Sequence, residues 1–128
     1  MTFKSKVKTS LLIFTAALLL SSCSPKDQTK NSISNNSESI QIDYTNGQYT
    51  PSEVTIKVGQ TVTFNNKGDD LIWPASNIHP THEIYPDFDP QKPLNPNNSW
   101  SFTFTKPGIW KFHDHLMPQL IGEITVEE

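Results

Sequence analysis

The sequence predicts an all-β fold, a β-sandwich, for residues 39–128. Apolar residues alternate with polar ones in several short runs, which is the period of strands that bury one face. Glycine, proline and asparagine separate these runs, and none of the runs has the 3.6-residue period of an amphipathic helix. About seven short strands in about 90 residues, with turns between them, favour a sandwich of two packed sheets.

The first strand is expected at residues 40–44, where every second residue is apolar, and Asn46-Gly47 then predicts a turn. Further alternating runs predict strands at residues 54–58, 62–64, 100–104, 110–112 and 121–126. Residues 67–98 are rich in proline and have little periodicity, so they are expected to form long loops with one short strand. The tryptophan and phenylalanine side chains supply enough apolar area for the core of a domain of this size.

The first 22 residues have the features of an export signal. Lysines at positions 4, 6 and 8 precede an apolar run at residues 11–20, which is too short for a membrane-spanning helix of about 20 residues. The run ends in Leu20-Ser21-Ser22-Cys23, which resembles the bacterial lipobox. This resemblance implies a lipoprotein signal peptide at residues 1–22, acylation of Cys23, and a location outside the cytoplasm, on the periplasmic side or the outer surface of the cell envelope.

Residues 23–38 are expected to form a disordered tether that begins at the lipidated cysteine, because only Ile33 is apolar in residues 24–38. Cys23 is the one cysteine of the sequence, so residues 39–128 have no thiolate for a metal or a disulfide. Removal of residues 1–22 takes 3 of the 10 basic residues and no acidic one, which leaves 7 lysines, 13 acids and a net charge of −6. This charge argues against a nucleic-acid partner, and contact with the membrane is expected through the acyl chains.

Two segments resemble the cupredoxin family, of the plastocyanin and amicyanin type. The first runs from Tyr49 to Asn65 and contains an aromatic residue, a proline, an alternating strand, a glycine turn and a strand that ends in asparagine. The second runs from Trp100 to His113 and is similar to the two strands that lead into the family's metal loop. Residues 122–126 resemble the closing strand. The resemblance implies that residues 39–128 form a Greek-key β-sandwich with a metal site at one end.

The metal loop departs from the family at its ligand positions. In an amicyanin-like alignment Asp114 stands at the position of the cysteine, Met117 at that of the loop histidine and Leu120 at that of the axial methionine. The family's upstream histidine, expected soon after Asn65, has no counterpart there. Because a blue-copper site needs a cysteine thiolate with two histidines, the sequence predicts a cupredoxin-like lipoprotein without a blue-copper centre.

All 4 histidines of the chain lie in two clusters, His79-Pro80-Thr81-His82 and His113-Asp114-His115. In an extended strand, residues i and i+2 point to the same side, so His113 and His115 can chelate one ion. Pro80 holds the other cluster in a loop, where its two imidazoles can also converge. Imidazole suits copper and zinc, and copper(II) has the higher affinity for nitrogen and oxygen donors, so we expect a copper site formed by the four imidazoles, with zinc as the weaker candidate.

Four further residues are candidates for additional ligands or orienting contacts: Asp114, Met117, Glu83 and Trp73. The two acids can add an oxygen ligand or orient imidazoles, the methionine can add sulfur or pack at the loop, and the tryptophan can shield the site. The strand period places Phe112 and Asp114 on the core face, and hence the histidines of this strand on the opposite face. The ion then lies to one side of the family's usual position, or the loop twists after Phe112.

No residue pattern indicates an enzyme. No nucleophile motif surrounds any serine, and the loop carboxylates Asp87 and Asp89 are expected to be solvated turn residues. We therefore expect a copper-binding protein for storage, delivery or tolerance of copper, whose partner besides the membrane is a copper donor, a copper acceptor or a redox protein. Two alternatives remain open: electron transfer through an atypical copper centre, and a metal-free interaction domain on the cell surface.

Overall fold

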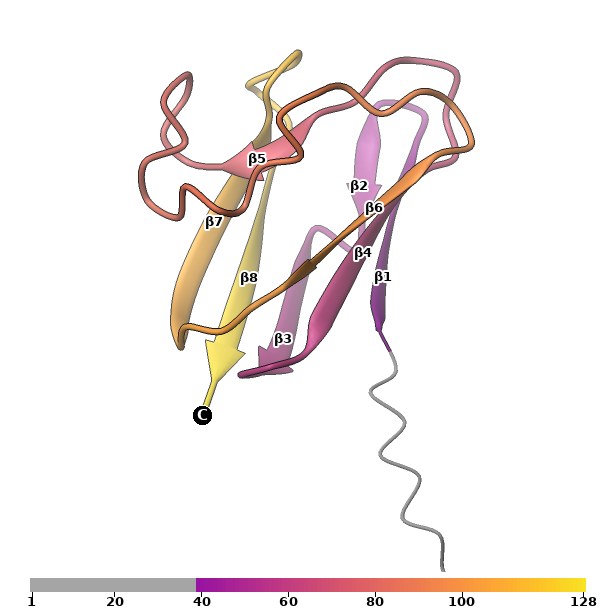
Figure 1. Cartoon of the computed structure of the whole chain (residues 1–128). Coiled ribbons are helices and arrows are strands. Elements are labelled where there is room, and N and C mark those ends of the chain that lie inside the picture. The colour runs from indigo at the N-terminus through magenta and orange to yellow at the C-terminus, as the bar shows by residue number, and fades with distance from the viewer. Residues whose placement is uncertain (1–38) are drawn as a thin grey trace, which may run out of the picture. The chain divides into compact units, whose positions relative to one another are not determined.

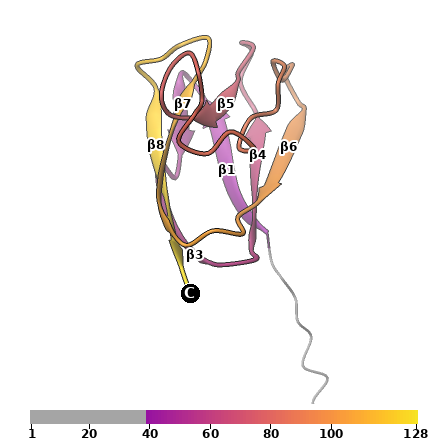
Figure 2. The ribbon, with the colours of Figure 1, turned by 60° about the vertical axis from the view of Figure 1, so that its left-hand side comes forward.

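The computed structural model describes residues 39–128, so the signal peptide, Cys23 and the tether predicted for residues 1–38 lie outside the described residues. The described residues form eight strands and no helix, arranged as two four-stranded sheets (Figure 1 and Figure 2). This part of the chain accordingly has no helix of membrane-spanning length and hydropathy. The predicted all-β sandwich is the observed fold.

One sheet has the strand order β2-β1-β4-β6, and the other has the order β3-β8-β7-β5. The strands of the first sheet are β1 (Ile40–Thr45), β2 (Gln48–Thr50), β4 (Thr61–Asn66) and β6 (Ser99–Thr103). Those of the second are β3 (Glu53–Lys57), β5 (Pro74–Ser76), β7 (Gly108–Asp114) and β8 (Ile121–Glu127). β1 pairs with β4, and β3 with β8, in parallel, whereas the other neighbours are antiparallel. The chain therefore crosses repeatedly from one sheet to the other.

Strand β2 is absent from the sequence prediction, and turn chemistry explains its presence. Asn46 and Gly47 have φ angles of 51° and 75°, and two successive positive φ values are typical of the tight two-residue turn of a hairpin. This turn folds Gln48–Thr50 back onto β1. Val58 was predicted as part of a strand, but β3 ends at Lys57 and the Val58 side chain is 41 % exposed.

The core between the sheets is built largely from aromatic side chains. Phe112 of β7 and Phe64 of β4 are both fully buried and meet edge to face with ring centroids 5.3 Å apart, which joins the two sheets. Burial of a side chain of this size contributes about 1.5–3 kcal/mol. The buried apolar cluster consists of Ile42, Tyr44, Tyr49, Ile56, Val62, Phe64, Ile72, Tyr85, Phe88, Leu94, Phe104, Phe112, Ile124 and Val126.

The long segment between β5 and β6 is anchored in this core, although it has little regular structure. Tyr85 and Phe88 are 1 % and 0 % exposed, and Phe88 stacks on Trp100 with ring planes 5° apart. The N–H of Ser76 donates to the carbonyl of Phe88 over 2.9 Å, which holds the segment against β5. Figure 1 shows this segment at the same end of the sandwich as the connection from β7 to β8.

Candidate metal centre

The pairing of β5 with β7 brings the two histidine clusters together. In this pairing Ala75 lies opposite His113, near the end of β7. The loop that follows β5 carries His79 and His82, and its backbone closes on itself through a hydrogen bond of 2.7 Å from the N–H of His82 to the carbonyl of Ile78. The loop therefore presents its histidines to the end of β7.

The four imidazoles form one compact group in which the two clusters alternate. The ring centroid of His79 lies 5.2 Å from that of His113 and 4.8 Å from that of His115. The ring centroid of His82 lies at the same two distances, 5.2 and 4.8 Å, from these two rings. The rings of His113 and His115 are 6.2 Å apart. Each loop histidine thus contacts both histidines at the end of β7.

The nitrogens that face each other across the group have the separations of neighbouring ligands on one ion. His79 Nδ1 lies 3.2 Å from His113 Nε2, and His82 Nε2 lies 2.8 Å from His115 Nδ1. Two nitrogens about 2.0 Å from an ion, at right angles to each other, would be about 2.8 Å apart. Ligand atoms of His79, His113 and His115 all lie within 4.8 Å of one another, so these three residues can hold a metal ion.

Two contacts outside the group fix which nitrogen carries the hydrogen. His82 Nδ1 lies 2.7 Å from a carboxylate oxygen of Asp89, and His113 Nδ1 lies 2.9 Å from the amide oxygen of Asn77. Because these oxygens accept hydrogen bonds, each Nδ1 is the donor, and a neutral ring then has its lone pair on Nε2. Metal-binding histidines characteristically donate their second nitrogen to such an oxygen. Both Nε2 lone pairs therefore point into the group, where they face Nδ1 of His115 and of His79 and can bind an ion placed between the rings.

The environment keeps the rings of the β7 end neutral. Burial, together with His82, His79 and His115, lowers the pKa of His113 from 6.5 to about 4. Burial, together with His82 and His79, also lowers the pKa of His115. Neutral imidazole is the form that binds metal, so these two rings are ready for an ion at neutral pH.

The four side chains differ in their access to solvent. His113 and His82 are buried, at 2 % and 5 % exposure, whereas His115 is half-buried and His79 is exposed. His82 also has a φ of 53°, in the left-handed region that few non-glycine residues adopt. Such backbone conformations are concentrated at functional sites. Because His79 is the exposed member of the group, a ligand from solution reaches the group at this residue.

Asp114 is fully buried, as the strand period predicts for the core face, but its oxygens are engaged away from the imidazoles. One oxygen accepts from the hydroxyl of Tyr49 at 2.5 Å and from the N–H of Trp73 at 3.0 Å. The other accepts from the N–H groups of Leu116 and Met117 at 2.9 and 3.1 Å. Burial and the Asp114 charge raise the pKa of Tyr49, so its hydroxyl keeps its hydrogen. Asp114 thus fixes the loop after β7.

The three other candidate residues have different surroundings. Trp73 adjoins the group, with its ring centroid 4.5 Å from that of His115. Met117 is half-buried and packs against the apolar core. Glu83 is exposed, and within residues 39–128 no hydrogen bond or ion pair joins it to a histidine.

The prediction that Asp89 is a solvated turn residue is wrong. Asp89 is half-buried and accepts from Trp73 Nε1 at 2.8 Å, from the N–H of Gln91 at 2.7 Å, and from His82. Burial alone would raise the pKa of Asp89, but these hydrogen bonds outweigh it and lower the pKa. An acid in the same loop as a candidate ligand was the available signal. Asn77, which is 36 residues from His113 in the chain, has no such local signal.

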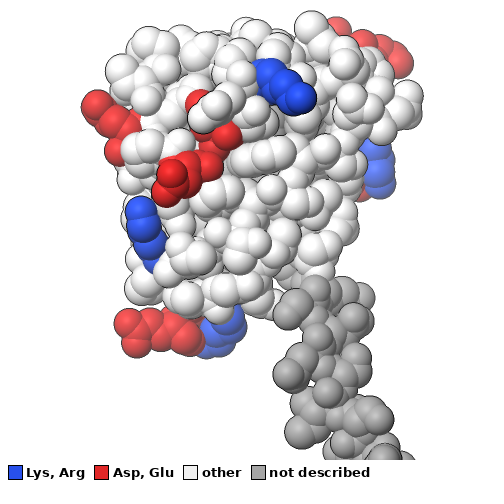
Figure 3. All heavy atoms as spheres, viewed as in Figure 1, with Lys and Arg blue, Asp and Glu red and all other residues white. Residues whose placement is uncertain are grey.

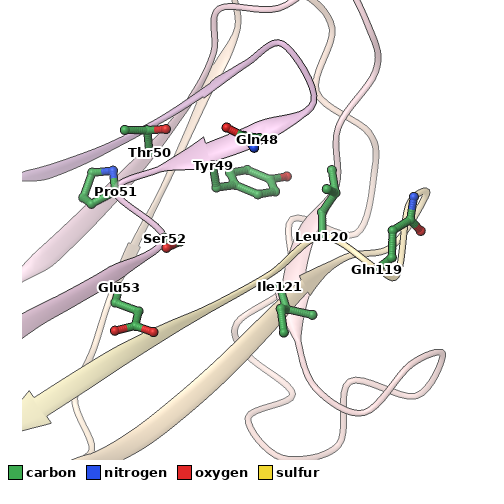
Figure 4. A pocket seen from close by; sticks show the side chains of 9 residues that line it. All are labelled: Gln48, Tyr49, Thr50, Pro51, Ser52, Glu53, Gln119, Leu120 and Ile121. Carbon is green, nitrogen blue, oxygen red and sulfur yellow. The ribbon is translucent and has the colours of Figure 1, made fainter.

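A hollow of about 570 Å³ lies between β2 with the start of β3 and the chain that leads into β8 (Figure 4). Its lining consists of residues 48–53 and 119–121 and includes no histidine. It meets the surroundings of the group at Tyr49, whose hydroxyl donates to Asp114, at Leu120, whose carbonyl accepts from the N–H of Asp114, and at Ile121, which pairs with His113. On the face of the molecule shown in Figure 3, lysine side chains lie apart from one another and most of the surface carries no charge.

Comparisons of sequence and structure with known proteins point to the cupredoxin-like proteins. The family profile described as "Cupredoxin-like domain" matches residues 10–126. A purple cupredoxin from Nitrosopumilus maritimus is 26 % identical, with a TM-score of 0.61, over 69 % of this chain and 99 % of that one. A reduced Cu(I) form of an amicyanin variant is 23 % identical, with a TM-score of 0.62, over 70 % of this chain and 83 % of that one. No protein of curated function matches the chain.

Proposed function

The chain belongs to the cupredoxin-like domain family, and from this premise we propose that it binds copper outside the cytoplasm through His79, His82, His113 and His115. Its role is storage, delivery or tolerance of copper rather than catalysis. The observation that carries the proposal is the pair of facing nitrogen contacts, 3.2 and 2.8 Å long, between the two histidine clusters.

Copper is preferred to zinc because of the donor set and the family. Residues 39–128 contain no cysteine, and the group offers imidazole nitrogens, for which copper(II) has the highest affinity among the common divalent ions. One similar solved structure is described as a Cu(I) form. Without a thiolate ligand, bound copper(II) should lack the intense colour of blue-copper proteins.

A storage or delivery role is supported by the exposure of His79, which gives an incoming ligand access to the ion. Electron transfer through an atypical centre is the second candidate. It is supported by the burial of His82 and His113, whose second nitrogens are also held by hydrogen bonds, because ligands held in this way move little when the metal changes its charge. Easy removal of copper by chelators would favour the first role, and fast electron self-exchange at a reversible potential would favour the second.

Titration of the purified protein with copper(II) and zinc(II) tests the metal site. We expect saturable binding of one copper ion, and loss of that binding in both double variants, His79→Ala with His82→Ala and His113→Ala with His115→Ala. Glu83→Gln serves as the control, since Glu83 is exposed in the same loop. If the unaltered protein shows no saturable binding, the proposal is wrong and a metal-free interaction domain becomes the better interpretation.

Anchoring is a separate part of the proposal. Acylation of Cys23 would hold the protein on the envelope, where its partners would be the membrane and a copper donor, copper acceptor or redox protein. Incorporation of a labelled fatty acid, and its loss in Cys23→Ser, is the expected result. A protein that stays in the membrane fraction without any label would contradict the lipid anchor.

A further inference from the structure

Asp114 is a buried acid without a cationic partner among the described residues. Its exposure is 0 %, and its hydrogen bonds come from one hydroxyl and three backbone N–H groups. The lysine–carboxylate ion pairs of residues 39–128 are Lys57–Glu127 and Lys67–Asp43, and the one histidine–carboxylate contact is that of His82 with Asp89, so none involves Asp114. Burial of a carboxylate without a nearby positive charge is costly, and buried charges are normally paired or adjoin a metal.

Asp89 is a second carboxylate beside the imidazole group. Asp89 is half-buried and contacts His82 directly at 2.7 Å. Asp114 lies between His113 and His115 in the chain and acts electrostatically on both rings. When all four imidazoles are in the neutral form that binds metal, the group and the two carboxylates together carry two negative charges. A divalent ion would neutralise this set, whereas a monovalent ion would leave one negative charge in a largely buried site.

We propose that Asp114 and Asp89 determine the oxidation state of the metal, so that the site holds copper(II) in preference to copper(I). This inference rests on the proposed copper site and adds the role of two residues that are not ligands. Asp114 acts through its charge, because all of its hydrogen bonds go to groups other than the imidazoles. Asp89 acts through its charge and through its contact with His82.

Asp114→Asn separates charge from coordination. The asparagine oxygen can keep the N–H groups of Leu116 and Met117, and its NH₂ group can donate to the Tyr49 hydroxyl, so the contact with the N–H of Trp73 is the one lost. The four imidazoles remain. Tyr49→Phe is the matched structural control, since it removes one donor to Asp114 and keeps the charge. Asp87→Asn removes an exposed carboxylate from the loop that carries Asp89.

The test compares copper(II), zinc(II) and copper(I) affinities of the whole protein and these variants. A lost negative charge weakens the binding of a divalent ion by twice the free energy that it costs a monovalent ion. For Asp114→Asn we expect a loss of about 100-fold for both divalent ions and about 10-fold for copper(I). The reduction potential of bound copper should then rise by about 59 mV. The ratio of copper(II) to copper(I) affinity should be unchanged in Tyr49→Phe and Asp87→Asn.

Equal losses for divalent and monovalent ions in Asp114→Asn would overturn the inference and leave the copper site intact. Absence of copper binding by the unaltered protein would instead overturn the proposed function. If Asp114→Asn does not fold, the same affinity measurements on Asp89→Asn test the inference. In that variant both oxidation states lose affinity because His82 is affected, but the ratio of copper(II) to copper(I) affinity should still fall about 10-fold. An unchanged ratio there would equally overturn the inference.

Discussion

His82 Nδ1 lies 2.7 Å from Asp89 Oδ2, seven residues further along the same loop, and this contact decides which nitrogen of His82 faces the other histidines. The second oxygen of Asp89 accepts from the indole N–H of Trp73. One carboxylate therefore orients both a candidate ligand and the aromatic ring beside the group.

Asp89→Asn should weaken copper(II) binding about 10- to 100-fold. The N–H groups of Trp73 and Gln91 both require the oxygen at Oδ1, so the asparagine NH₂ turns towards His82. His82 Nδ1 must then accept, and Nε2 carries the hydrogen that faces His115. Nitrogen NMR of the metal-free variant should report this change of tautomer. A variant with the original tautomer and full affinity would contradict the expected role of Asp89, and Asp87→Asn is the control.

The metal-free protein should lose stability as the pH falls from about 6.5 to about 4. The pKa of His113 is about 4 in the folded protein and 6.5 ordinarily, so in this range the unfolded chain binds a proton that the folded chain does not. The contribution of His113 to the free energy of unfolding is therefore fully present above about pH 6.5 and is lost as the pH falls to about 4. Thermal unfolding midpoints across the range test this, and His113→Gln should flatten the profile. Identical profiles for the two proteins would contradict it.

Trp73 should report copper binding by its fluorescence. Its ring centroid is 4.5 Å from that of His115, so copper(II) in the group would quench its emission at short range, whereas zinc(II) has no unpaired electron and should not. Of the 3 tryptophans, Trp73 should account for most of the quenching. Trp73→Phe should remove most of the quenching and Trp110→Phe should retain it. Equal quenching in both variants would place the copper elsewhere.

Phe88→Ala should reduce both stability and copper affinity. Phe88 is fully buried and anchors the loop that carries two of the histidines, so its truncation should cost about 3–5 kcal/mol of unfolding free energy. Ile42→Ala is the matched control, because Ile42 is also fully buried but lies in β1, outside that loop. Where both variants are folded, only Phe88→Ala should bind copper more weakly. Equal affinities would show that this anchor does not position the histidines.

The strand periodicity was sufficient to predict most of the sandwich, because alternation and turn residues are local signals. It also placed Asp114 on the core face, where the structure has it at 0 % exposure. It did not reveal β2, whose three residues pair only because the Asn46-Gly47 turn folds them back. The periodicity also did not predict that Tyr85 and Phe88 anchor the long loop, since this anchoring depends on packing against strands that are distant in the chain.

The composition of the histidine group could be inferred from clustering alone, but its internal geometry could not. Which histidine faces which is set by the pairing of β5 with β7 and by the closed loop after β5, both of which are tertiary features. Glu83, the acid next to His82 in the chain, forms no hydrogen bond or ion pair with a histidine among residues 39–128, whereas Asp89 and Asn77 each form a hydrogen bond with one. Adjacency in sequence was therefore a poor guide to the residues that support the imidazoles.

The anchored loop also bears on how fast a bound ion could leave. Two of the four imidazoles belong to the segment that Tyr85 and Phe88 secure in the core, so dissociation by opening of this segment would require partial unfolding of the sandwich. Spontaneous escape should consequently be slow. A recipient molecule that offers a competing ligand at the exposed His79 avoids that barrier, so the dwell time of the ion would depend on encounters with such a recipient rather than on equilibrium affinity.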